Sequence, residues 1–320
     1  MKKISPDPQQ SGRHPPDRTY LYGMQKVQVP IPADFSFSEC CWYLDRGFDD
    51  CVYKVRNGRI IKALRLGGAS LLIEVREGDG VLKINVLQGQ ADAVALAAYI
   101  REWLDIDRDL TPFYTLLGKD KRLRYMPVDF QGLRLVGIVD LFEALSWSII
   151  GQQINLKFAY SLKRRLVEKY GQALTHEGET YYLFPEPTVL AGADPEDLRA
   201  MQFSRSKAAY LTGLANVFAN GGLSRELLLS LPDRGSQLEV LTKIKGIGIW
   251  TANYTLMKSL RDPSGIPHGD TGLLTALANH GVIRDRKELQ KIERFFSKYR
   301  GWESYLVFYL WRSLAVKPTV

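Results

Sequence analysis

The chain has 320 residues and a mass of 36.3 kDa, which is too long for one small domain and suits two or three. Hydrophobic residues make up 45% and charged residues 24% of the chain, as in ordinary globular proteins, so wholesale disorder is excluded. The 43 Lys and Arg outnumber the 35 Asp and Glu, and the net charge of +8 favours a polyanionic partner such as nucleic acid, although many basic proteins bind none.

The first residues of the chain are not expected to form a secretory signal. Residues 1–18 are rich in Pro, Lys and Gln and lack the apolar core of a secretory leader, so we expect a flexible basic tail. No apolar run is long enough to cross a bilayer, which predicts no membrane partner and a cytoplasmic, nucleoid-associated protein. Cys40, Cys41 and Cys51 form no C-x-x-C pair, which argues against a zinc or dithiol site and fits a reducing compartment.

Residues 19–135 are expected to form an N-terminal α+β domain. Two apolar segments flank Asn57-Gly58, a strong hairpin signal, and two more flank a turn at 77–80. A helix over 91–103 would cover one face of this antiparallel sheet.

Residues 136–320 are expected to be helical throughout, because apolar residues recur there at helical spacing. Asp194 before Pro195 predicts the N-cap of one helix, and two final helices are expected to separate near Gly301. Helices within 105–135 belong either to the N-terminal domain or to this helical part. The expected fold class is therefore α+β, an antiparallel sheet with a covering helix followed by an all-α core.

The stretch 241–254 carries the most informative pattern in the chain. It predicts a helix, a tight turn containing Gly246 and Gly248, and a second helix. The free N–H groups at the start of the second helix would attract an anion such as a DNA phosphate. The pattern resembles the helix-hairpin-helix motif of DNA repair proteins, and an ordinary turn between two helices is the alternative.

Two further segments accompany this motif. A Gly/Pro-rich loop at 267–274 contains Asp270, and a helical segment from 141 leads into Gly151-Gln152-Gln153. Together with the N-terminal sheet and the closing segment 302–311, they resemble the helix-hairpin-helix base-excision glycosylase superfamily, in its alkylation-repair branch, the 3-methyladenine glycosylases II.

The resemblance implies that Asp270 is the catalytic residue of a DNA glycosylase. Cleavage of the N-glycosidic bond builds positive charge on the sugar, which a nearby carboxylate stabilises, and alkylated purines leave readily because they are already cationic. The alternative role of Asp270, the N-cap of a helix starting at Thr271, is compatible with catalysis. Bifunctional members carry a Schiff-base lysine where this chain has Trp250, so we expect a monofunctional enzyme that leaves the strand intact.

The resemblance also implies a base pocket and a set of DNA contacts. Aromatic rings that stack on a cationic purine would line the pocket, namely Trp250, Tyr254, Trp311 and Trp42. The helical spacing of Trp250 and Tyr254 fits plain core packing equally well. Gln153 would fill the space left by the flipped base, where related sequences have leucine. The other expected DNA contacts are Gln152, Lys245, Gly246, Gly248 and Thr251.

A monovalent cation, Na⁺ or K⁺, is implied at the main-chain carbonyls of Thr242, Ile244 and Gly246. No cofactor is expected for catalysis, and no iron–sulfur cluster is expected because no cysteine follows Cys51. The expected partner is double-stranded DNA containing alkylated bases, bound by a monomer. The alternatives are a glycosylase for oxidised or deaminated bases and a non-catalytic protein that binds lesions.

Overall fold

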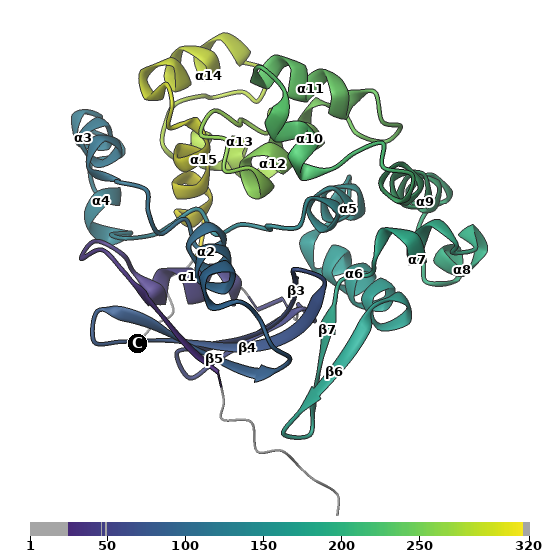
Figure 1. The fold of residues 1–320 in the computed structure, drawn as a ribbon. Coiled ribbons are helices and arrows are strands. Elements are labelled where there is room, and N and C mark those ends of the chain that lie inside the picture. The colour runs from purple at the N-terminus through teal and green to yellow at the C-terminus, as the bar shows by residue number, and fades with distance from the viewer. Residues whose placement is uncertain (1–24, 46, 49, 316–320) are drawn as a thin grey trace, which may run out of the picture.

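The structure is a computed structural model, and it describes residues 25–45, 47–48 and 50–315 (Figure 1). The basic tail expected at residues 1–18 lies outside the described residues. In the part of the chain that is described, no helix is long and apolar enough to cross a membrane.

A five-stranded antiparallel sheet forms the N-terminal part, in the order β1-β5-β4-β3-β2. Its strands are β1 (Lys26–Pro30), β2 (Tyr53–Arg56), β3 (Arg59–Leu66), β4 (Ala69–Gly78) and β5 (Val81–Gln88). The turn between β2 and β3 has Asn57 at φ 50° and Gly58 at φ 67°, as a two-residue hairpin requires, which confirms the predicted hairpin. The expected second hairpin joins β4 to β5.

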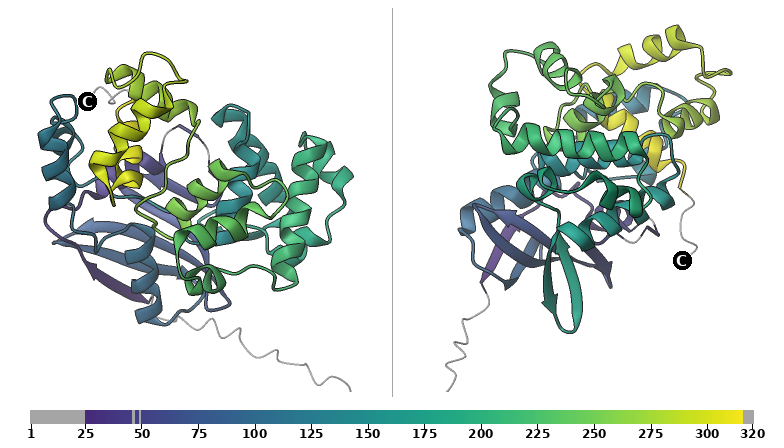
Figure 2. Two further views of the ribbon diagram at one scale, coloured as in Figure 1. Left: turned by 90° about the horizontal axis from the view of Figure 1, so that it is seen from above. Right: turned by 90° about the vertical axis from the view of Figure 1, so that its right-hand side faces the viewer.

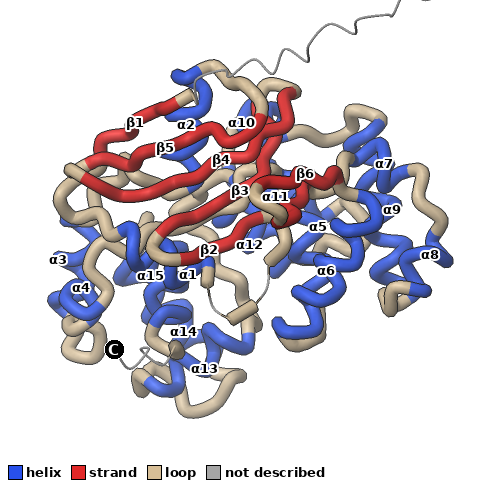
Figure 3. The backbone as a smooth tube through the Cα atoms, turned by 90° about the horizontal axis from the view of Figure 1, so that it is seen from below, coloured by secondary structure: helices blue, strands red, loops and turns tan. Residues whose placement is uncertain are grey.

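Helices cover one face of this sheet. α1 (Phe37–Leu44) and α2 (Ala93–Trp103) lie between the sheet and the other helices, and the views from below and from the side show the strands on the outside (Figures 1, 2 and 3). Two short helices follow, α3 (Thr111–Lys119) and α4 (Met126–Asp129). Phe113 of α3 packs edge-on against Tyr309 with ring centroids 5.0 Å apart, so α3 contacts the end of the chain.

The C-terminal part contains the helix-hairpin-helix and the helices packed around it. These are α5 (Leu141–Gly151), α6 (Leu156–Tyr170), α7 (Pro187–Ala191), α8 (Pro195–Ala200), α9 (Arg205–Ala219), α10 (Arg225–Ser230), α11 (Arg234–Thr242), α12 (Ile249–Ser259), α13 (Thr271–Asn279), α14 (Leu289–Phe296), the 3₁₀ helix η1 (Ser297–Tyr299) and α15 (Glu303–Arg312). Asp194 caps α8 by accepting a 2.9 Å hydrogen bond from the Glu196 N–H, and Gly301 separates the last two helical segments at φ 81°, both as expected.

The expectation of helix throughout the C-terminal part was wrong between α6 and α7. A further β-hairpin forms there from β6 (Gln172–His176) and β7 (Glu179–Leu183). Glu177 and Gly178 take the positive φ values of a two-residue turn, 49° and 75°, and glutamate gives little sequence signal for that conformation. The hairpin is stable because its apolar side chains pack on the outer face of the sheet, in a cluster of Ala63, Leu72, Tyr181 and Leu183.

One hydrophobic core runs through both parts of the molecule, from Val27 in the sheet to Leu310 in α15. The segment that connects the two parts, at residues 137–138, forms backbone hydrogen bonds to both of them. The Gly137 N–H donates to the Trp103 carbonyl and the Ile138 N–H donates to the Lys258 carbonyl, each at 2.9 Å. This seam brings α12, the second helix of the hairpin motif, against the covering helix of the sheet.

Candidate functional site

The residues 243–248 form the tight turn between α11 and α12. Gly246 has φ 92°, and a Cβ atom there would lie 2.4 Å from Cγ of Tyr210, so the position requires glycine. Gly248 is extended (φ −88°, ψ 177°), and a Cβ atom there would meet nothing within 4 Å. No side chain caps α12, so its first N–H groups are open to an anion. Lys245 is exposed beside them.

The loop between α5 and α6 lies against this turn. The Gln152 side-chain amide donates to the Gly246 carbonyl oxygen at 2.9 Å and to Thr251 Oγ1 at 3.1 Å. Its neighbour Gln153 is exposed and has φ 56°, a left-handed conformation that non-glycine residues seldom adopt. Gln153 is thus exposed to solvent, whereas Gln152 connects the loop to the turn between α11 and α12 through Gly246 and the buried Thr251.

A row of aromatic rings extends from the hairpin into the helical core. Trp250 and Tyr254 stack with ring centroids 5.5 Å apart and planes 15° apart. Tyr254 is followed by Trp311 of α15, whose ring centroid lies 6.3 Å away. Trp250 and Trp311 remain partly exposed, whereas Tyr254 is buried. The three predicted pocket aromatics therefore lie together, although they also pack against the core.

Asp270 lies at the far end of this row. Its Oδ1 accepts a hydrogen bond from the Leu273 N–H at 2.7 Å, which confirms that Asp270 is the N-cap of α13. The same oxygen accepts a second hydrogen bond from Trp311 Nε1 at 2.9 Å. Oδ2 has no hydrogen bond among the described residues, and the side chain is half-buried. One carboxylate oxygen is thus held in place by two hydrogen bonds, whereas the other is not.

Trp42, the fourth predicted pocket aromatic, lies on α1 beside α15. The Arg312 guanidinium covers its ring at 3.9 Å and also forms a two-point ion pair with Glu39, at 2.7 and 3.0 Å. One face of Trp42 is therefore occupied by protein, and its role in base binding stays a prediction.

The predicted cation ligands lie at the C-terminal end of α11 and in the turn. The Gly246 carbonyl accepts from Gln152, and the Ile244 carbonyl accepts from the Ile247 N–H at 3.0 Å. Each carbonyl oxygen has a second lone pair, and the partial negative charge at the end of α11, at Thr242, favours a cation. The donor set is compatible with a monovalent ion. Within the described ranges, no cluster of three or more His, Cys, Asp or Glu could hold a metal.

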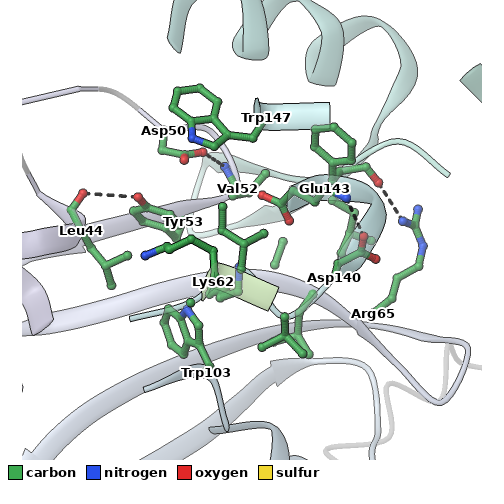
Figure 4. A pocket seen from close by; sticks show the side chains of 18 of the residues that line it. Leu44, Asp50, Val52, Tyr53, Lys62, Arg65, Trp103, Asp140, Glu143 and Trp147 are labelled. Carbon is green, nitrogen blue, oxygen red and sulfur yellow. Dashed lines mark hydrogen bonds between the residues drawn. The ribbon is translucent and has the colours of Figure 1, made fainter. Parts of the chain in front are cut away.

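A cavity of about 250 Å³, with Tyr254 in its lining, lies along the seam between the sheet and α5, α6 and α12 (Figure 4). Its lining includes a buried ion triad, in which Lys163 Nζ contacts Asp50 at 2.9 Å and Glu143 at 3.0 Å. Burial alone would lower the pKa of Lys163, but the two carboxylates raise it. Asp270 does not line this cavity.

Two buried residues of this region escaped the sequence interpretation. Trp147 of α5 donates from Nε1 to the Tyr254 hydroxyl at 3.2 Å, a contact that no local pattern indicates. Lys62 is only 7% exposed, and burial lowers its pKa. The sequence did carry a signal for the burial of Lys62. In β3 this residue lies between Ile60 and Leu64 at a spacing of two, which places all three side chains on the same, inward face of the strand.

Comparison with known proteins shows which family the chain belongs to. Residues 146–300 match the family described as HhH-GPD superfamily base excision DNA repair protein. The chain is 36% identical over 294 residues to a DNA-3-methyladenine glycosylase of Bacillus subtilis, and the match covers 90% of this chain and 97% of that protein.

Two solved structures share the fold. The 3-methyladenine DNA-glycosylase from Archaeoglobus fulgidus superposes with a TM-score of 0.76 at 22% identity, covering 93% of this chain and 100% of that one. The 8-oxoguanine glycosylase/lyase of Clostridium acetobutylicum gives 0.71 at 22% identity, covering 91% and 98%. The fold is thus common to glycosylases named for different bases, and the base must be decided by the site.

Proposed function

The chain belongs to the HhH-GPD superfamily of base excision DNA repair proteins, and we propose that it removes alkylated purines from double-stranded DNA without cutting the strand. It is a DNA glycosylase, an enzyme that hydrolyses N-glycosyl bonds. The relative that matches along almost its whole length is named for 3-methyladenine, which supports this class of base.

The observation that carries the proposal is the setting of Asp270. Its Oδ1 is fixed by Leu273 and Trp311, and Trp311 joins it to the ring row of Tyr254 and Trp250. An aromatic row attracts a cationic purine by about 0.5–2 kcal/mol per ring. A purine held at the row would place its sugar toward the carboxylate, whose free oxygen stabilises the developing positive charge.

The proposed reaction is hydrolysis at C1′ of the deoxyribose. The bond from C1′ to the purine nitrogen breaks, and its electron pair neutralises the positive charge of the alkylated base. Water then adds to the oxocarbenium-like C1′, and its proton passes to the Asp270 carboxylate or to solvent. The products are the free base and an abasic site. Trp250 has no amine, so it forms no Schiff base that would lead to strand cleavage.

We propose that the turn between α11 and α12 and the adjoining loop between α5 and α6 bind the DNA. The open N–H groups of α12 and the exposed Lys245 suit a phosphate, and a monovalent cation on the carbonyls of Thr242, Ile244 and Gly246 would add positive charge there. The exposed Gln153 would enter the stack that the flipped base leaves. Gln152 and Thr251 would hold the two segments in register.

Base release from a duplex containing methylated purines tests the proposal. Asp270→Asn keeps the N-cap, since asparagine caps as well as aspartate, and we expect it to lose about 100-fold or more in excision rate. Asp194→Asn is the matched control, because Asp194 caps α8 in the same way and should be silent. Equal rates for wild type and Asp270→Asn would remove this carboxylate from the mechanism.

The same assay distinguishes the proposed function from the two alternatives, a glycosylase for oxidised or deaminated bases and a non-catalytic protein that binds lesions. A preference for releasing 8-oxoguanine or hypoxanthine over 3-methyladenine would indicate a glycosylase for oxidised or deaminated bases, which the shared fold alone permits. Tight binding of alkylated DNA without base release would indicate a lesion-binding protein.

A further inference from the structure

The cavity that Tyr254 helps to line has the features of a small-molecule site. Its volume of about 250 Å³ is below the roughly 300–1,000 Å³ of pockets for drug-sized ligands, and so suits a single fused-ring system. Exposed Gly67 and half-buried Arg65 are among its lining residues, so solvent lies close to this side of the cavity. Trp250, Trp311 and Asp270 do not line it.

Lys62 supplies a hydrogen-bond donor that lacks a partner. Its side chain is 7% exposed and points into the cavity (Figure 4). Its Nζ lies 5.4 Å from the Trp103 ring centroid and 5.7 Å from that of Tyr53, and it has no hydrogen bond or ion pair among the described residues. A buried amine in this state gains free energy from any acceptor that reaches it.

The other lysines of the cavity already have partners. Lys163 is paired with Asp50 and Glu143, and Lys258 Nζ donates to the Tyr43 hydroxyl at 2.9 Å and also to the Val136 carbonyl. A multiply charged anion would therefore meet buried carboxylates. An uncharged ligand with a single strong acceptor complements Lys62 better.

The walls favour a flat aromatic ligand. Side chains that can stack or pack edge-on surround the space, namely Tyr43, Tyr53, Tyr99, Trp103, Trp147 and Tyr254. Tyr254 belongs to this wall and to the ring row, and its hydroxyl accepts from Trp147. The cavity and the proposed reaction site thus share one aromatic side chain.

We propose that this cavity binds a free purine base, the class of product that the enzyme releases, with Lys62 donating to a ring nitrogen or carbonyl and the aromatic walls packing on the ring. This inference rests on the proposed function for the choice of a purine. Bound there, the base would lie outside the reaction site yet in contact with a ring that the substrate also needs.

Binding of free 3-methyladenine and of adenine, followed by calorimetry or tryptophan fluorescence, tests the inference. Lys62→Met fills the same space without a donor, and we expect it to weaken binding about tenfold or more. The matched control is Lys83→Met on β5 of the same sheet, which does not line the cavity and should bind as wild type does. Trp250→Ala should also retain binding, and melting curves verify that each variant folds.

Several results would overturn the inference. The first is that the wild-type protein binds no free purine, and the second is that Lys62→Met binds it with the same affinity as wild type. The third is that Trp250→Ala loses binding while Lys62→Met retains it, and this result would place the base at the ring row. Inorganic phosphate that binds through Lys62 when purines do not would show an anion site instead. Excision of methylated bases is measured on the same preparation. Excision without Lys62-dependent binding refutes only the cavity site, and Lys62-dependent binding without excision refutes only the proposed function.

Discussion

The indole nitrogen of Trp311 and the capping oxygen of Asp270 are joined by a hydrogen bond of 2.9 Å across 41 residues of sequence. The same indole ring lies 6.3 Å from Tyr254. One side chain therefore fixes the carboxylate and also extends the surface on which a base would stack. In the proposed mechanism, positioning of the acid and recognition of the base are therefore coupled through Trp311.

Replacing Trp311 by phenylalanine should separate these two tasks. Trp311→Phe keeps an aromatic ring but removes the donor, and loss of a hydrogen bond to a charged group costs about 1.5–3 kcal/mol. We expect the single-turnover excision rate to fall by about 10–100-fold, with little change in substrate affinity. Trp302→Phe, at the start of the same helix and stacked on Phe113, is the control. A pure affinity defect in Trp311→Phe would contradict the positioning role.

Gln153 should act on base flipping more than on protein stability. The side chain is exposed and its φ of 56° suits glycine, so Gln153→Gly should leave the free energy of unfolding unchanged or slightly higher. We expect slower excision from a fully paired duplex. The defect should shrink when the lesion is mispaired, because a mispaired base costs less to extrude. An equal defect on both substrates would argue against a wedge role.

The two hairpin glycines should respond differently to alanine. Gly246→Ala forces a Cβ into Tyr210 at φ 92°, and we expect a loss of about 1–3 kcal/mol in the free energy of unfolding. Gly248→Ala meets no protein atom within 4 Å and should fold normally. Both should weaken binding to any duplex while leaving the preference for lesions unchanged. Urea unfolding and titrations with damaged and undamaged DNA measure the two effects, and a changed lesion preference would show that the hairpin is more than a phosphate anchor.

Lys62→Met should stabilise the protein, and the gain should depend on pH. Burial holds the pKa of Lys62 below its ordinary value of 10.5, so in the interval between the two values the unfolded chain binds more protons than the folded one. Wild-type stability therefore rises with pH there as the cost of the buried charge disappears. We expect Lys62→Met to gain on the order of 1 kcal/mol at low pH, and the gain to fade toward pH 10.5.

Urea unfolding of both proteins from pH 6 to pH 10 checks this expectation. Lys83→Met, which alters an exposed pair with Asp79, should show no comparable trend. A gain that grows as pH rises would mean that the amine is stabilised by a partner in the folded state.

The local elements of the fold were predictable because their determinants are neighbours in sequence. A two-residue turn needs positive φ and takes Asn57-Gly58, and a helix start needs a side-chain acceptor and takes Asp194 or Asp270. The hairpin between β6 and β7 was missed because its turn begins with Glu177, and its stability comes from packing on the sheet. That packing is invisible in a local pattern.

From the sequence we could infer the order of the motifs, the hairpin glycines, the lone carboxylate in its loop and the absence of a lysine at position 250. The folded structure was needed to show that Trp311 donates to Asp270, that Arg312 covers Trp42, and that Lys62 faces a cavity lined in part by Tyr254. These two groups of features differ in the sequence distance between the residues that determine them. Backbone conformation is set by adjacent residues, whereas these side-chain contacts join segments whose separation is fixed only when one core closes around all of them.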